Sequence, residues 1–205
     1  MDELGLFPLG LVLLPTEQVP LHIFEPRYRE LIGECLEQGV PFGLVYADDD
    51  GMREIGTRAT VTEVTERFDD GRLTIVVEGG ERFRLVELTD GRSFHTGEVE
   101  PLEDQHDPPD EADTDRALEL FGRLVELTGA DVEAPAADVP QLSFAVAGRF
   151  DFSPDLKQEL LEATSERVRL RRLCELLAAA ADTVERQKEI AALAQTNGKV
   201  QRPGT

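Results

Sequence analysis

The sequence predicts an α+β protein in which an antiparallel sheet, curled into a small barrel, precedes a helical bundle that ends in a long helix. β-branched residues and tight-turn sequences such as Asp69-Asp70-Gly71 fill the chain up to residue 102. From residue 117 onward the apolar residues follow a helical spacing. Between these parts lies an acidic stretch with Pro108-Pro109, which indicates a linker. We therefore expect a barrel subdomain at 1–102, an acidic linker at 103–116 and a helical subdomain at 117–205.

The N-terminal stretch predicts two short strands and a helix. Apolar runs at residues 11–14 and 21–24 are separated by prolines, and proline has no amide hydrogen to donate to a sheet. Pro26 suits the first turn of a helix, and Gly39 suits a left-handed residue at its end. The apolar face expected on this helix consists of Tyr28, Leu31, Ile32, Cys35 and Leu36.

An antiparallel meander is expected after this helix. The alternation of apolar and polar residues slips between Val61 and Val64, which indicates a β-bulge. Gly79-Gly80 is interpreted as one of the turns between strands, as is Asp90-Gly91. Together with the two N-terminal runs, these strands are sufficient to curl into a small barrel. The expected strands cover residues 42–47, 56–68, 73–78, 82–88 and 93–99.

Four helices are predicted beyond the acidic stretch. The first has an apolar face at residues 118–125 and ends near Gly129. The second is expected at residues 138–150, with Pro140 in its first turn. The third begins at Ser153-Pro154, because a serine cap followed by proline is typical of a helix start.

The fourth helix is expected to begin near Thr164 or Ser165. Its residues 185–195 alternate charge with alanine, which predicts an exposed or pairing end. Residues 197–205 are expected to be frayed. The residues expected to face inward on this helix are Val168, Leu173, Leu176, Leu177 and Ala180.

A formal net charge of −21 is the most unusual property of the 205-residue chain. Clustered lysines and arginines bind phosphate groups, so this charge argues against nucleic acid and anionic membranes as partners. It favours a role in solubility and leaves open the recognition of basic partners by acidic groups. For residues 103–115 the alternative to a linker is an acidic docking strip.

The cysteines and the N-terminus predict a soluble, cytoplasmic protein. Cys35 and Cys174 lie on apolar faces of expected helices, which favours buried free thiols and a reducing compartment. Asp2 and Glu3 stand where a signal peptide requires positive charge. No stretch is long enough to span a bilayer. We expect a monomer or a weak dimer.

No catalytic residue, metal site or cofactor is expected. The sequence contains neither G-x-S-x-G nor H-E-x-x-H. Ser153 and Lys157 have the spacing of a dyad, but a helix cap explains Ser153 better. His22, His95 and His106 lie in separate segments, which does not favour a shared metal site.

Seven motifs follow one another along nearly the whole chain. They are FPLGLVLLP at 7–15, PLHIFEPRYRELI at 20–32, FGLVY at 42–46, GTRATVTEV at 56–64, GGERFRL at 79–85, LSFAVA at 142–147 and QELLEATSERVRLRRLCELL at 158–177. In this order they resemble the Lon N-terminal domain family, the substrate-binding domain of the ATP-dependent protease Lon. The resemblance implies a stand-alone copy of that domain, with a PUA-like pseudo-β-barrel followed by a helical bundle.

The same resemblance implies a recognition module for unfolded or tagged proteins, to which the family assigns no agreed catalytic residues. Full-length Lon adds an ATPase module and a Ser-Lys protease module. The sequence has no G-x-x-x-x-G-K-[ST] loop, and its Gly198-Lys199 pair is followed by Val200. We therefore expect no ATPase or protease activity from these residues.

A surface that grips another chain is the remaining functional candidate. Exposed sheet edges near the N-terminal strands, or a cleft between barrel and bundle, suit an unfolded or extended polypeptide. Glu25 is expected to pair with Arg27 or Arg29 and to fix the start of the first helix rather than to contact a ligand. The residues expected to line or support the cleft are His22, Phe24, Arg27, Tyr28, Arg82 and Phe83.

Two alternatives accompany this hypothesis. Phe24, Tyr28 and Phe83 are also typical core residues, so they could simply fill the interior. The second alternative is a different function on the same barrel, because a fold does not determine an activity: a small-molecule-binding protein or a hydrolytic enzyme. RNA binding, known for PUA-like barrels, is disfavoured by the charge. The expected partners are an unfolded or extended polypeptide and a protease or chaperone that receives it.

Overall fold

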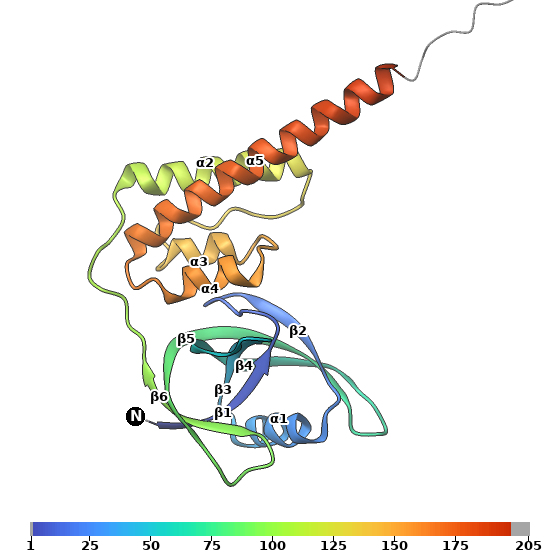
Figure 1. Ribbon diagram of the computed structural model, residues 1–205, viewed down its shortest axis with the longest axis vertical. Coiled ribbons are helices and arrows are strands. Elements are labelled where there is room, and N and C mark those ends of the chain that lie inside the picture. The colour runs from blue at the N-terminus through green and yellow to red at the C-terminus, as the bar shows by residue number, and fades with distance from the viewer. Residues whose placement is uncertain (1, 198–205) are drawn as a thin grey trace, which may run out of the picture.

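A barrel and a set of helices above it make up the protein in the computed structural model, which describes residues 2–197. The predicted α+β class is confirmed (Figure 1). The strands are β1 (Asp2–Leu9), β2 (Gln18–Ile23), β3 (Phe42–Asp48), β4 (Gly51–Arg67), β5 (Leu73–Thr89) and β6 (His95–Pro101). The helices are α1 (Pro26–Gln38), α2 (Glu111–Thr128), α3 (Leu142–Ala147), α4 (Pro154–Glu162) and α5 (Glu166–Asn197).

One six-stranded sheet forms the barrel. Its strand order is β2-β5-β4-β3-β1-β6, and a further pairing of β5 with β6 closes it. The long strand β5 therefore has β4 along one side, and β2 followed by β6 along the other. Helix α1 covers the end of the barrel that is remote from the other helices (Figure 1).

The sheet departs from the expected antiparallel meander at its first strand. β1 lies parallel to β3, with Leu6 opposite Gly43, while the other pairings are antiparallel. The expectation of a strand at residues 11–14 was wrong, because β1 precedes this run. Residues 11–17 instead pass between barrel and helices, and Leu13 and Leu14 are buried there. A short apolar run looks the same in a sequence whether it forms a strand or a buried connection.

Gly79-Gly80 is not a turn, and this prediction was also wrong. β5 runs through both glycines, so three strands rather than four follow β3. The Gly79 amide donates to the Glu17 carbonyl at 2.9 Å, and the Thr16 amide donates to the Gly79 carbonyl at 2.7 Å. A Cβ atom on Gly79 would lie 2.1 Å from the Leu14 carbonyl oxygen. Glycine is therefore needed here because another stretch of backbone approaches closely.

Helix α1 has the predicted ends. Pro26 occupies the first turn, and Gly39 ends the helix in the left-handed conformation. Glu25 forms an ion pair with Arg27 at 2.7 Å, as expected for the start of this helix. The predicted bulge is present too, as a register shift between Val61 and Glu63.

The helical part differs from expectation at three points. Helix α3 is shorter than the predicted 138–150, because Gln141 has a φ of 53° and cannot continue a right-handed helix. Ser153 occupies the N-cap position of α4, but its side chain makes no capping hydrogen bond. Val168 on α5 is 57% exposed rather than inward-facing. Ser165 does cap α5, since its hydroxyl accepts from the Val168 amide.

Other expectations for the helices hold. Gly129 ends α2 in the left-handed conformation. Cys35 and Cys174 are buried free thiols. The described side chains of α5 from Glu185 to Leu193 are mostly exposed, and this end of the helix projects from the body of the protein (Figure 1). Of the frayed segment expected at 197–205, all but Asn197 lies outside the described residues.

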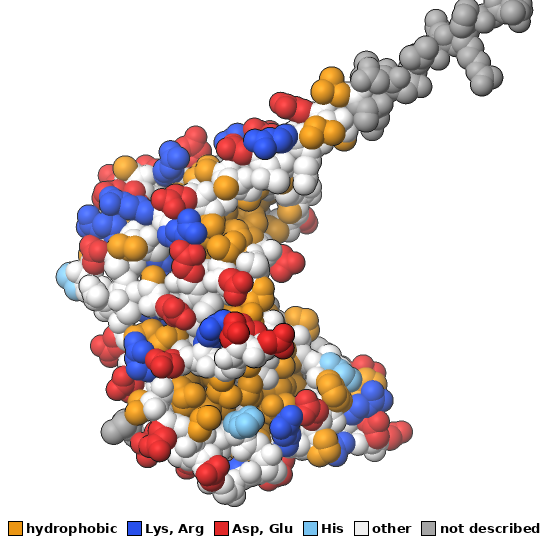
Figure 2. All heavy atoms as spheres, viewed as in Figure 1, with side chains coloured by type: hydrophobic (Ala, Val, Ile, Leu, Met, Phe, Trp, Pro, Cys, Tyr) orange, Lys and Arg blue, Asp and Glu red, His pale blue; other side chains and the backbone are white. Residues whose placement is uncertain are grey.

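One apolar cluster spans the junction between barrel and helices, and two further clusters lie within the barrel and under α1. Val12, Leu14 and Ile55 from the barrel side join the buried residues of all four upper helices. Helices α3 and α4 lie between the barrel and the α2–α5 pair (Figure 1). The surface is hollowed on one side, where the upper helices overhang the barrel (Figure 2, right). The exact boundaries 1–102, 103–116 and 117–205 stay a prediction.

None of the helices within residues 2–197 has the length and hydrophobicity that crossing a membrane requires.

The close approach at Gly79 leads to a stability prediction. Gly79→Ala is expected to lower the free energy of unfolding by about 1–3 kcal/mol, because the added methyl group meets backbone that cannot rotate away. The measurement is urea denaturation followed by circular dichroism. Gly122→Ala is the matched control: Gly122 lies exposed within α2 with nothing near its Cβ position, so alanine is expected to stabilise by about 0.5–1 kcal/mol. Equal effects of both substitutions would contradict the prediction.

Candidate functional site

An exposed group of aromatic side chains lies beside the β4–β5 hairpin. Phe24 follows β2 and is 59% exposed. The His22 ring stacks on it, with 6.0 Å between ring centroids, and meets Phe68 edge-on at 5.7 Å. The Arg72 guanidinium lies 4.7 Å from the centre of the Phe68 ring. We call His22, Phe24, Phe68 and Arg72 the aromatic patch.

Arg27 and Tyr28 lie close in sequence to this patch but have other neighbours. Tyr28 is 6% exposed and stacks on Phe7 with the ring centroids 4.0 Å apart. Burial raises the pKa of its hydroxyl. The Arg27 guanidinium lies over the Tyr28 ring and pairs with Glu25. Tyr28 therefore belongs to the barrel core, and Arg27 covers it from outside.

Arg82 and Phe83 lie far from the aromatic patch. Phe83 has no exposed surface and packs with Leu4, Leu6, Val45 and Val99. Arg82 points the other way, into the junction between barrel and helices. The six predicted residues are thus not brought together in one site. Because Phe83 is buried, it can support a binding surface but cannot contact a ligand. The binding roles of all six residues stay predictions.

A cluster of buried charges joins barrel and helices. Arg82 donates to the carbonyl oxygens of Leu161 at 2.7 Å and Ala163 at 2.8 Å, and its other terminal nitrogen pairs with Asp104. Arg169, fully buried on α5, makes a two-point contact with Asp104 at 3.0 and 2.6 Å. We call Arg82, Asp104, Ser143, Glu166 and Arg169 the arginine cluster.

The remaining groups of the arginine cluster complete its hydrogen bonds. Glu166 accepts from Arg169 at 2.5 Å, and from the amide and the hydroxyl of Ser143 at 2.9 and 2.7 Å. The Arg169 Nε atom donates to the Ser143 hydroxyl at 2.7 Å. Both guanidinium groups also lie over the Phe144 ring. Buried charges are tolerated when every one is paired and hydrogen-bonded in this way.

Asp104 lies in the stretch interpreted as a solvated linker, but its carboxylate is held at the junction by Arg82 and Arg169. Burial alone would raise the pKa of its carboxyl group, but hydrogen bonding to Arg169 and the charges of Arg169 and Arg82 outweigh burial and hold the pKa below its usual range. Asp110 has a structural role too, because its side chain caps α2 by accepting from the Asp113 amide. Asp107 adds to these contacts, because it accepts from the Ser165 hydroxyl and pairs with Arg167.

A second buried ion pair lies at the same junction. The Lys157 ammonium group on α4 donates to Glu17, whose other carboxylate oxygen accepts from the Leu14 amide at 2.9 Å. Lys157 is therefore held by Glu17, and this pairing explains the residue better than a dyad with Ser153 does. Within residues 2–197 no group of three or more His, Cys, Asp or Glu side chains could hold a metal ion.

A pocket of about 520 Å³ opens at the junction, a volume within the usual range for ligand sites. Its floor is the stretch of β5 from Gly79 to Arg82. Thr16 and Gln141, the two non-glycine residues with positive φ in the described chain, both line it, with φ of 67° and 53°. Strained backbone of this kind collects at binding sites. The other lining residues are Pro15, Pro101, Leu102, Glu103 and Asp104.

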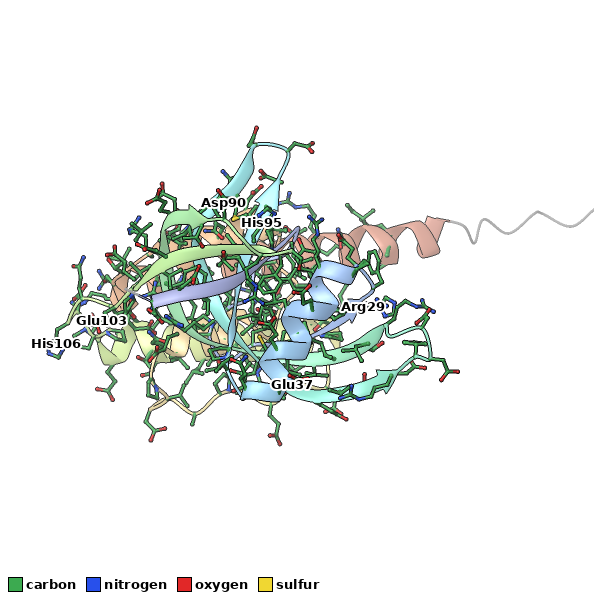
Figure 3. The ribbon with its side chains drawn as sticks, turned by 90° about the horizontal axis from the view of Figure 1, so that it is seen from below. Arg29, Glu37, Asp90, His95, Glu103 and His106 are labelled. Carbon is green, nitrogen blue, oxygen red and sulfur yellow. The ribbon has the colours of Figure 1, made fainter. Side chains whose placement is uncertain are left out.

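The aromatic patch and this junction pocket lie on different sides of the protein. Arg29 donates to the Asp70 carbonyl oxygen at the tip of the β4–β5 hairpin, next to the patch. Glu103, at the pocket, lies at the opposite side of the molecule from Arg29 (Figure 3). His95 and His106 are also well separated (Figure 3).

Several residues of these two sites were not found from the sequence. Phe68 and Arg72 flank the recognised turn at Asp69 to Gly71, and that position beside a hairpin tip was their only signal. Asp104 stands among other acidic residues, and Arg169 stands in a helix with other arginines. Nothing in the local sequence distinguishes the buried members of such runs from the exposed ones.

Known proteins that resemble this chain share its fold. A family model described as the ATP-dependent protease La (LON) substrate-binding domain matches residues 3–179. The crystal structure of a Lon N-terminal domain protein from Xanthomonas campestris is 27% identical, with a TM-score of 0.67, covering 87% of this chain and 98% of that one. The N-terminal domain of a Mycobacterium avium complex Lon protease has a TM-score of 0.68 at 19% identity, covering 86% and 98%, which supports the fold alone.

Curated relatives are much longer than this chain. Lon protease of Paraburkholderia phytofirmans is 28% identical across 97% of this chain, which corresponds to 27% of that protein. Lon protease of Parabacteroides distasonis is 29% identical across 65% of this chain and 17% of its own length. The chain thus spans about a quarter of the first relative and less of the second.

Asp104 leads to a prediction of pH-dependent stability. Its folded pKa is depressed, so ionised Asp104 stabilises the fold above its unfolded pKa of about 4, and this contribution is lost as the pH falls through the folded pKa. At pH 7, Asp104→Asn is expected to lower the free energy of unfolding by about 3–5 kcal/mol, because it leaves two buried guanidinium groups without their shared charge.

The measurement is urea denaturation of both proteins at several pH values between 7 and 3. The difference between wild type and Asp104→Asn should shrink toward the acid end. Asp49→Asn, at an exposed turn position, is the control and should change little at any pH. A difference that stays constant with pH would show that Asp104 does not contribute through its charge.

Proposed function

The chain belongs to the family of the ATP-dependent protease La (LON) substrate-binding domain, and on that basis we propose that it is a module that recognises polypeptides without catalysing a reaction itself. The single observation that supports a particular binding surface is the exposure of Phe24. The bound chain is proposed to be unfolded or extended. The protein that receives it is proposed to be a protease, because the matching stretch of the curated relatives is part of proteins named Lon protease.

Phe24 is an exception among the phenylalanines of this chain. The chain has ten, and six of them are buried while three are half-buried. Single exposed apolar side chains are common, but an exposed aromatic ring that lies among other rings is typical of an interaction surface. Unfolded chains present the apolar side chains that folded proteins bury, so such a ring suits them as ligands.

The surroundings of Phe24 favour recognition over accidental exposure. His22 lies opposite Thr74 in the β2–β5 ladder, and its Nδ1 atom lies 3.3 Å from the Thr74 hydroxyl. The His22 ring stacks against Phe24 and makes a T-shaped contact with Phe68, so the three rings support one another. Aromatic rings that are held in place lose little conformational entropy when a ligand binds.

Arg72 gives the patch a polar margin. It covers Phe68 and pairs with Asp70, so it adds no free charge. An apolar centre with paired charges at its rim is typical of protein-recognition surfaces. This composition supports a ligand chosen by exposed apolar residues rather than by a charged tag.

Replacement of Phe24 tests the proposal directly. Phe24→Ala is expected to weaken binding to a permanently unfolded protein, such as reduced and carboxymethylated α-lactalbumin, by roughly fivefold or more, because anchors of this kind contribute most of the binding energy. The melting temperature should stay nearly unchanged, because the side chain is exposed. Binding is measured by isothermal titration calorimetry and melting by circular dichroism.

Two further variants serve as controls. Leu88→Ala removes another exposed apolar side chain, 52% exposed on β5 and outside the patch, and should leave binding unchanged. Phe83→Ala should lower the free energy of unfolding by about 3–5 kcal/mol, as expected for a core residue. Unaltered binding by Phe24→Ala, or an equal loss with Leu88→Ala, would rule out the aromatic patch as the recognition surface.

A further inference from the structure

Strand β5 has an interruption in its pairing at the floor of the junction pocket. On one side it pairs with β2 up to Glu78, opposite Gln18, and with β6 from Phe83, opposite Pro101. Gly79 bonds instead to the backbone of Thr16 and Glu17, and the Arg82 carbonyl accepts from the Leu102 amide. Within the described chain, Gly80 and Glu81 therefore have no strand neighbour on this side.

This interruption is open to solvent. Gly80 and Glu81 are exposed, and both line the junction pocket. Pro15 and Pro101 also line the pocket, and neither has an amide hydrogen that could pair with β5. An unpaired, exposed stretch of strand is a place where another polypeptide can add its backbone.

The charges at the pocket are unbalanced. Its one arginine, Arg82, is 3% exposed and is held by two carbonyl oxygens and Asp104, so its charge is already paired. Glu81 and Glu103 also line the pocket, are exposed, and form no ion pair with the described residues. With a chain charge of −21 around them, two free carboxylates at one opening favour a cation and disfavour an anion.

We propose that the junction pocket binds a short segment of extended polypeptide that carries a lysine or arginine. The backbone of the segment reaches the unpaired edge of β5 at Gly80 and Glu81, and its basic side chain lies between Glu81 and Glu103. The inference rests on the proposed function, because it takes polypeptides as the ligand, but it concerns a surface distinct from the aromatic patch.

The dimensions of the opening limit the ligand. Two residues of β5 are free, so backbone pairing extends over about one residue of the bound segment. Because Gly80 has no side chain, the ligand backbone can approach the strand closely there. The pocket volume of about 520 Å³ accommodates one long side chain together with adjoining backbone. Selectivity therefore lies in the basic side chain and not in a long sequence motif.

The test uses three end-capped glycine-serine peptides that differ only in a central lysine, glutamine or glutamate. They are titrated into the isotope-labelled full chain at low salt, and binding is followed by the NMR signals of backbone amides. The lysine peptide should shift the Gly80 and Glu81 signals and bind roughly five- to tenfold more tightly than the glutamine peptide. The glutamate peptide should not bind, and added salt should weaken the lysine peptide.

A charge-matched pair of variants checks the two carboxylates. Glu81→Gln with Glu103→Gln should abolish the preference for lysine over glutamine. Glu63→Gln with Glu66→Gln removes the same amount of charge from exposed positions of β4 outside the pocket. This double variant should keep the preference for lysine over glutamine. Melting curves of both double variants should coincide with that of wild type, because all four side chains are exposed.

The outcomes separate this inference from the proposed function. Equal binding of the lysine and glutamine peptides, or an unchanged preference in Glu81→Gln with Glu103→Gln, overturns the pocket inference even if Phe24→Ala weakens binding of unfolded protein. The same result for both double variants overturns it too, because the effect would then come from total charge. A lysine preference lost only with Glu81 and Glu103 supports it, whatever the result at Phe24.

Discussion

Two buried guanidinium groups that share one carboxylate determine how this protein is assembled. Arg82 comes from the barrel, Asp104 from the connecting segment and Arg169 from α5. Removing charges from water is costly, so each group is stable only when the other two are in place. This requirement, together with the apolar residues that Val12, Leu14 and Ile55 contribute to the helical core, joins the helices to the barrel in one arrangement.

The two candidate binding surfaces follow from that arrangement in different ways. The junction pocket lies where β5, within the described residues, has no strand neighbour on one side, because the pairing with β2 ends before Gly80 and the pairing with β6 begins after it. The connecting segment that contains Asp104 also lines the pocket. The aromatic patch depends on the barrel alone, through the pairing of β2 with β5. A change at the arginine cluster should therefore disturb the pocket and leave the patch intact.

Local chemistry made part of the fold predictable, and contacts between distant segments made the rest unpredictable. Pro26 and Gly39 determine the ends of α1 by their own backbone preferences, so the sequence was sufficient there. Gly79 serves a backbone contact with Leu14, and no local pattern separates that role from a turn. Phe24 was singled out for recognition, but the partners of Arg82 were not foreseen, because Asp104 is held in place by a residue of α5 that lies 65 residues later in the chain.

The residues that pair at the junction lie far apart in the sequence, which has a consequence for folding during synthesis on the ribosome. The partner of Glu17, Lys157, lies 140 residues later in the chain. The carbonyl groups that accept from Arg82 lie 79 and 81 residues later. Chains emerge from the N-terminal end and fold in units as they appear. While the helices are being synthesised, Glu17 and Arg82 of the barrel side are therefore exposed to water. Docking of α4 and α5 is the step that dehydrates them, so closure of the junction follows the synthesis of these two helices.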